Sequence, residues 1–191
     1  MDEVHINKPA AAQRELDAAI RIFFSGEDIL AVHTLAHAAY SVLHDLDRKR
    51  GAKSDQVYAE TLEDMRRKFS GAFASYDVRS FRKLMEDRDR SGANFLKHAD
   101  KDSADSLNLS RLKTDDLMFR ACHIYFGLGF SGTPEMKAFE RWYFAVYPKE
   151  AGDRILTKFG DVSEFSLEHQ LEFGAYLLKI DTQIDEETID K

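Results

Sequence analysis

The chain of 191 residues has one cysteine, three prolines and no long hydrophobic run. A single cysteine, Cys122, cannot form an internal disulfide, and we expect it to be a small buried apolar residue of a helix. The prolines lie where helices are expected to begin or end, at Pro9, Pro134 and Pro148. No apolar stretch approaches the roughly 20 residues that span a bilayer, so no membrane partner is expected.

Positive charge is also scarce, because 27 Lys and Arg residues face 34 Asp and Glu residues, a formal net charge of −7. Proteins that bind duplex DNA through its phosphates usually have the opposite balance, which leaves only a local basic patch for such a partner. The first ten residues are polar and lack the apolar core of a secretory signal, so we expect a cytoplasmic location. Phosphate loops, dinucleotide fingerprints, nucleophile elbows and paired Cys-x-x-Cys motifs are absent, and no cofactor is predicted.

Hydrophobic residues make up 43% of the chain and recur at three- and four-residue steps. This periodicity predicts an all-α fold, a multi-helix bundle forming a single domain over residues 1–180, with an acidic tail at 181–191 that is expected to fray. Helices at 10–25 and 29–50, joined by a turn at Gly26, predict an N-terminal antiparallel helical hairpin. Further helices are expected at 54–74, from 77 toward 98, and at 114–128, 133–147, 149–159 and 166–179.

Histidines recur along the second predicted helix, and His33, His37 and His44 fall with Tyr40 within roughly 60° around its axis. The apolar stripe of this helix lies on a largely different face, so the histidine line is expected to border the core. Imidazoles four residues apart can share a metal ion, which makes His33 and His37 candidate ligands in a site that needs one or two more. The alternative is a boundary role in which each ring is hydrogen-bonded or hydrated.

The second polar cluster lies between residues 88 and 98. Asn94 and His98 are one helical turn apart and could contact the same small group, with His98 as a general acid or base near neutral pH. Arg88 or Arg90 could stabilise a developing phosphate charge. The alternative is a polar helix end, with Asn94 capping after a break at Gly92 and His98 favoured by the helix dipole.

Two other patterns favour structural roles. The acidic spacing of residues 100–105 is similar to a calcium loop, but it lacks the central glycine and has Arg111 where a bidentate glutamate is needed. A solvated connector is therefore expected there. An aromatic cluster could stack a flat ligand, but its helical spacing predicts core packing. Its members are Phe139, Trp142, Tyr143, Phe144 and Tyr147.

The segments 16–20 and 33–39, followed by Asn94-Phe95-Leu96-Lys97-His98-Ala99-Asp100, resemble a set of uncharacterised bacterial helical proteins. More distantly, they are similar to the HEPN superfamily of helical nucleotide-binding and ribonuclease domains. The resemblance covers about the first half of the chain and rests on short motifs. Seven residues separate Arg90 from His98, a longer spacing than in HEPN ribonucleases. The resemblance implies a helical bundle, often dimeric, with a polar groove near Asn94 and His98.

Three hypotheses about function follow. The first is a HEPN-like module that binds or cleaves RNA or a nucleotide in a bacterial stress or defence system, with His98, Asn94, Arg88 and Arg90 as its site. The second is a non-catalytic helical interaction protein, and a homo-oligomer is expected in either case. The third is a metal-binding helical bundle centred on His33 and His37. The sequence does not decide whether the protein is an enzyme.

Overall fold

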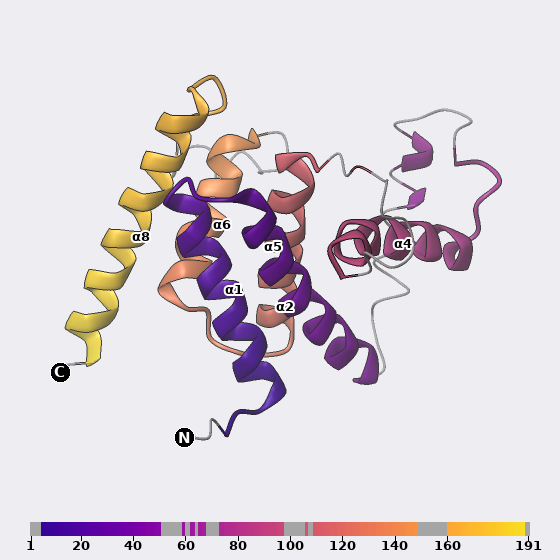
Figure 1. Ribbon diagram of the computed structural model, residues 1–191, viewed down its shortest axis with the longest axis horizontal. Coiled ribbons are helices and arrows are strands. Elements are labelled where there is room, and N and C mark those ends of the chain that lie inside the picture. The colour runs from indigo at the N-terminus through magenta and orange to yellow at the C-terminus, as the bar shows by residue number, and fades with distance from the viewer. Residues whose placement is uncertain are drawn as a thin grey trace. The chain divides into compact units, whose positions relative to one another are not determined.

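The computed structural model describes residues 5–50, 59, 62–63, 65–67, 73–97, 106, 109–148 and 160–189, and no strand occurs among them (Figure 1). The helices are α1 (Lys8–Phe24), α2 (Ile29–Lys49), α4 (Val78–Lys97), α5 (Arg111–Gly127), α6 (Pro134–Val146) and α8 (Leu167–Ile189). The predicted all-α fold is confirmed, and so is the N-terminal hairpin of α1 and α2.

Contacts group the chain into two compact units, one of residues 1–43 and 109–191 and the other of residues 44–108. Because two compact units can belong to one domain, the single domain expected over residues 1–180 stays a prediction. The helix expected at 149–159 lies outside the described residues, as does most of the one expected at 54–74.

The hairpin is set by local signals at both helix ends. Asn7 caps α1, since its Oδ1 accepts from the backbone N–H of Ala10 at 2.9 Å. Gly26 ends the helix with a φ of 73°, a conformation that glycine adopts without strain. Asp28 Oδ1 then accepts from the N–H of Leu30 at 2.8 Å, which starts α2 as the sequence predicted.

Helix α4 begins as expected, because Asp77 Oδ1 accepts from the N–H of Ser80 at 2.7 Å. The helix then runs to Lys97 without interruption at Gly92, so the break that the alternative of a polar helix end placed there does not occur. In the same unit, Phe81 is fully buried and meets the ring of Phe73 edge-on at 5.9 Å.

Two helix boundaries bear on the site. Thr133 caps α6 by accepting from the N–H of Met136 at 3.2 Å, and its hydroxyl donates to Asp17 Oδ1 on α1 at 2.7 Å. Helix α8 continues past Lys179, where the sequence placed its end, so the expected tail is helical as far as Ile189.

The core of the first unit is aromatic. Helix α6 packs against α1, α5 and α8, and α1 also packs against α5 and α8. Trp142 is fully buried and lies edge-on to Phe23 at 4.9 Å between ring centroids. Phe139 and Tyr143 are also buried, which confirms core packing for the centre of the predicted aromatic cluster. Cys122 is buried too, and this burial raises the pKa of its thiol.

Candidate functional site

The side chains predicted to act on RNA lie outside the described part of the chain. The backbone of α4 includes Arg88, Arg90 and Asn94, but the structure does not describe the side chains of these three residues. All of His98 lies outside the described residues as well. RNA binding or cleavage at these positions therefore stays a prediction.

Two members of the histidine line of α2, His33 and His37, are buried, and His44 is half-buried, which corrects for the first two the expectation that the line borders the core. His33 is 4% exposed and His37 is 7% exposed, whereas Leu35 and Val42 of the expected apolar stripe are only half-buried. The imidazole is accommodated because α5 provides a polar neighbour: His33 Nδ1 and Thr114 Oγ1 lie 3.1 Å apart. Within a buried environment, such hydrogen bonds offset much of the cost of removing a polar ring from water.

The two rings lie 6.5 Å apart between centroids, and His37 Nδ1 is 3.3 Å from Ser41 Oγ. Across the part of the chain that the structure describes, no group of three or more His, Cys, Asp or Glu side chains could hold a metal ion. His33 and His37 therefore have no third ligand among these residues, and hydrogen bonding to hydroxyl groups is the role that their contacts support.

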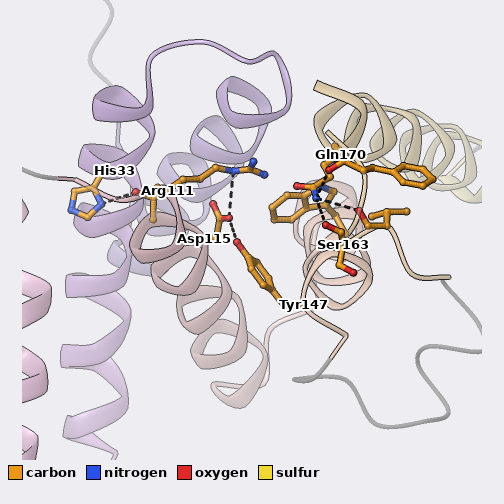
Figure 2. A network of polar contacts seen from close by, with 10 residues as sticks. His33, Arg111, Asp115, Tyr147, Ser163 and Gln170 are labelled. Atoms are coloured by element: carbon orange, nitrogen blue, oxygen red, sulfur yellow. Dashed lines mark hydrogen bonds and ion pairs between the residues drawn. The ribbon is translucent and has the colours of Figure 1, made fainter. Parts of the chain in front are cut away.

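A polar network that the sequence did not reveal joins α5 to the end of α6 (Figure 2). Tyr147 donates a hydrogen bond of 2.6 Å to Asp115 Oδ2, and Arg111 Nε lies 3.5 Å from the same oxygen. The guanidinium of Arg111 also lies over two aromatic rings, 5.2 Å from the centroid of Phe23 and 5.3 Å from that of Trp142. The arginine therefore pairs with one carboxylate while it packs against the aromatic core.

Burial dominates the electrostatics of this network. The Asp115 side chain has no exposed area, and this burial raises the pKa of its carboxyl to about 6, although Tyr147 and Arg111 oppose the rise. Burial also raises the pKa of Tyr147, and the adjacent Asp115 adds to that effect. An acid with a pKa near neutrality is typical of catalysis, but a substrate must reach it. The inaccessible Asp115 carboxyl instead fits a structural role.

A second buried polar centre fixes the start of α8. The side-chain amide of Gln170 donates to the carbonyl oxygens of Val162, Ser163 and Phe165, at distances of 3.1 to 3.2 Å. Figure 2 shows this amide pointing into the turn before the helix. Since these hydrogen bonds bind the turn to the first part of α8, they hold the helix in a defined orientation against α6.

Helix α8 carries exposed apolar side chains along one of its sides. Of the eight large hydrophobic side chains that the described residues expose, Tyr176 and Ile184 lie on this side, whereas Leu167 lies about 180° from Tyr176 around the axis and Phe165 precedes the helix. On a helix with 100° per residue, Phe173, Tyr176, Ile180 and Ile184 fall within roughly 80° of one another, and we call them the outer α8 stripe. Tyr176 is 60% exposed and Ile184 is 57% exposed. The other two are half-buried.

The side of α8 adjacent to the outer α8 stripe is committed to the core, because Leu177 lies only about 20° and Gly174 about 80° from Ile184 around the axis. Gly174 and Leu177 are buried, and a side chain at Gly174 would overlap the Phe24 ring of α1. Asp181 forms an ion pair with Arg141 of α6. Figure 1 shows α8 along the edge of its unit, beside α6. The helix thus has one face that packs inside the unit and a second apolar face that meets solvent.

The composition of α8 limits what this second face can contact. None of the described helices is both long and apolar enough to cross a bilayer. Helix α8 also contains six acidic residues and one lysine. The outer α8 stripe therefore has Glu168, Glu172 and Lys179 beside its Tyr176 edge and the buried Leu177 beside its other edge. No protein-family model, curated protein or solved structure matches this chain, so the geometry of the described residues is what carries an argument about its function.

Proposed function

We propose that this chain is a non-catalytic helical interaction module that binds a partner protein through the outer α8 stripe. The observation that carries the proposal is the exposure of Tyr176 and Ile184 on a helix whose adjacent face is buried in the unit. Apolar side chains grouped on one exposed face are typical of protein interaction sites, because their burial against a partner removes them from water.

The spacing of the stripe also fits a common form of recognition. Phe173, Tyr176, Ile180 and Ile184 follow one another at steps of three and four residues. Helices that bind in the groove of a partner use anchors at such steps, and tyrosine is frequent among the residues that dominate binding energy. Tyr176 is therefore the anchor that we expect to contribute most.

The buried polar groups support an interaction role over catalysis. Asp115 has a pKa suited to proton transfer but no exposed side-chain area. His33 is also buried, with its Nδ1 beside the hydroxyl of Thr114. Both groups have protein neighbours that account for their position, and neither side chain is open to a substrate.

Site-specific crosslinking tests the proposal. A photoreactive amino acid replaces Tyr176 in the cells that make the protein, and a matched sample carries it at Lys137, an exposed position on α6. We expect a discrete protein adduct from position 176 that is absent from position 137. The crosslinked protein, purified separately, should bind the native chain and should lose that binding with Tyr176→Glu.

Two results would contradict this proposal. One is the lack of any adduct at position 176 above the level at position 137. The other is a purified adduct protein that binds the native chain and the Tyr176→Glu variant equally well. Circular dichroism of the variant serves as the folding control, since an exposed side chain is substituted.

A further inference from the structure

We infer that the partner of the outer α8 stripe is a basic amphipathic segment of another protein, an inference that rests on the proposed function. Charge is the first argument. Six acidic residues and one lysine give α8 a formal charge of −5, whereas the whole chain has −7. Asp181 is paired with Arg141 of α6, which leaves a formal charge of −4 on the helix that also exposes the apolar stripe.

Two of these acidic residues lie next to the outer α8 stripe around the helix axis. Glu172 precedes Tyr176 by four residues, which places the two about 40° apart around the axis. Glu168 lies one turn earlier, and both glutamates are exposed, as is Lys179, which falls between them in angle around the axis. A partner helix that covers Tyr176 must bring its own margin close to these carboxylates. Lysine or arginine at that margin would form charge pairs there, which favours a basic partner.

A second copy of this chain fits the surface less well. Two α8 helices packed through their stripes would bring two sets of carboxylates together, and like charges across an interface are unfavourable. Lys179 is the one lysine or arginine of α8, so it cannot balance both sets. The homo-oligomer expected from the sequence therefore needs a different surface.

The negative charge of α8 also disfavours anionic membranes and nucleic acids as partners. Amphipathic helices that bind anionic membranes carry Lys and Arg on their polar face, opposite to the character of α8. Nucleic acids bind to basic surfaces through their phosphates. The glutamates beside the stripe would repel both kinds of partner. A positively charged segment with an apolar face could instead pair with these glutamates and cover the outer α8 stripe.

The experiment uses the full chain and synthetic peptides as probes. The first probe is an amphipathic peptide made only of leucine and lysine. The second has every lysine replaced by glutamate, and the third is polylysine, which has the charge without an apolar face. Binding is measured by calorimetry at low and high salt. We expect the leucine–lysine peptide to bind most tightly of the three. Its affinity should fall as the salt concentration rises, because salt screens exposed charges.

Two variants locate the binding. Tyr176→Ser should lower the affinity for the leucine–lysine peptide about tenfold, because an aromatic anchor is lost. The double variant Glu168→Gln with Glu172→Gln should weaken it at low salt and reduce its dependence on salt. Matched controls are Leu30→Ser, an exposed apolar residue on a different helix, and Glu27→Gln, an exposed glutamate outside α8. Both controls should bind like the native chain.

The outcomes separate the inference from the proposed function. Equal binding of the leucine–glutamate peptide, no binding of the leucine–lysine peptide, or native binding by both α8 variants would overturn the inference. A crosslinked adduct at Tyr176 that proves to be a second copy, or an acidic segment, would also overturn it and would leave the interaction role of α8 intact. Lack of any specific adduct would instead remove the proposed function itself.

Discussion

The indole Nε1 of Trp142 donates a hydrogen bond of 2.7 Å to the backbone carbonyl of Gln170, and both groups are buried. This contact joins the centre of α6 to the first turns of α8. Because the side-chain amide of the same Gln170 binds the preceding turn, one residue fixes both the position of the helix and the way the chain enters it. The direction in which the outer α8 stripe faces depends on this arrangement.

The first prediction concerns Gln170. Gln170→Leu removes the donor for three carbonyl oxygens and leaves them without this amide, so we expect a loss of about 2 to 4 kcal/mol in the free energy of unfolding. Urea denaturation followed by Trp142 fluorescence measures it. Gln183→Leu is the control, since this exposed glutamine lies on the same helix and should change stability by about 0.5 kcal/mol or less. Similar losses in both variants would show that the Gln170 amide does not hold the turn.

The second prediction concerns the close approach of α1 and α8 at Gly174. A methyl group there would overlap the Phe24 ring, so Gly174→Ala should destabilise the protein by about 1 to 3 kcal/mol despite the better helix propensity of alanine. Gly127→Ala is the matched control, because no atom lies within 4 Å of the position its Cβ would take. That variant should be neutral or gain up to about 1 kcal/mol. Thermal unfolding of the two variants decides, and equal melting temperatures would contradict the prediction.

Local signals made much of the fold predictable from the sequence. Gly26 with Asp28, Asp77, and Thr133 before Pro134 mark helix ends through their own side chains or backbone freedom, and each is found where it was expected. The end of α8 was placed too early. The acidic tail at 181–191 was expected to fray, which placed the end of the helix near Lys179. The ion pair of Asp181 with Arg141 of α6 stabilises the helix beyond that point.

The site depended on contacts between distant residues, which periodicity does not predict. Arg111 and Asp115 are four apart on one helix and their pairing could have been expected, but the hydroxyl of Tyr147 comes from another helix. The burial of His33 likewise needed Thr114 of α5. The outer α8 stripe has the same helical spacing as a core face, so only the packing of α8 shows that it meets solvent.

The third prediction separates interaction from RNA cleavage. If the proposed function holds, incubation of the purified protein with total RNA leaves the RNA intact at every metal and pH condition that keeps the chain folded. The measurement is gel electrophoresis of the RNA, with His98→Ala treated in parallel. Cleavage by the native protein that His98→Ala abolishes would support the HEPN-like hypothesis and contradict a non-catalytic role. Cleavage that persists in His98→Ala would indicate a contaminating nuclease.

The fourth prediction is the pH dependence that Asp115 gives to stability. Burial raises the pKa of this carboxyl in the folded protein from an ordinary value near 3.8 to about 6, so between these values the folded state holds a proton that the unfolded state has lost. Protonation of Asp115 therefore favours the folded state. This contribution to the free energy of unfolding is complete below about pH 4 and is lost as the pH rises through about 6. The difference of about two pKa units corresponds to roughly 3 kcal/mol.

Asp115→Asn isolates this contribution, because the amide keeps the shape of the side chain but cannot ionise. Relative to the native protein, the variant should therefore gain stability between pH 4 and pH 7, by an amount of the order of the 3 kcal/mol above, as measured by urea denaturation at each pH. Tyr147→Phe removes a hydrogen bond that opposes the rise in the pKa of Asp115. In that variant the pKa of Asp115 should rise further, so the fall in the free energy of unfolding with rising pH should continue to a higher pH than in the native protein. A constant difference between native protein and Asp115→Asn across this range would show that Asp115 does not titrate in the folded state.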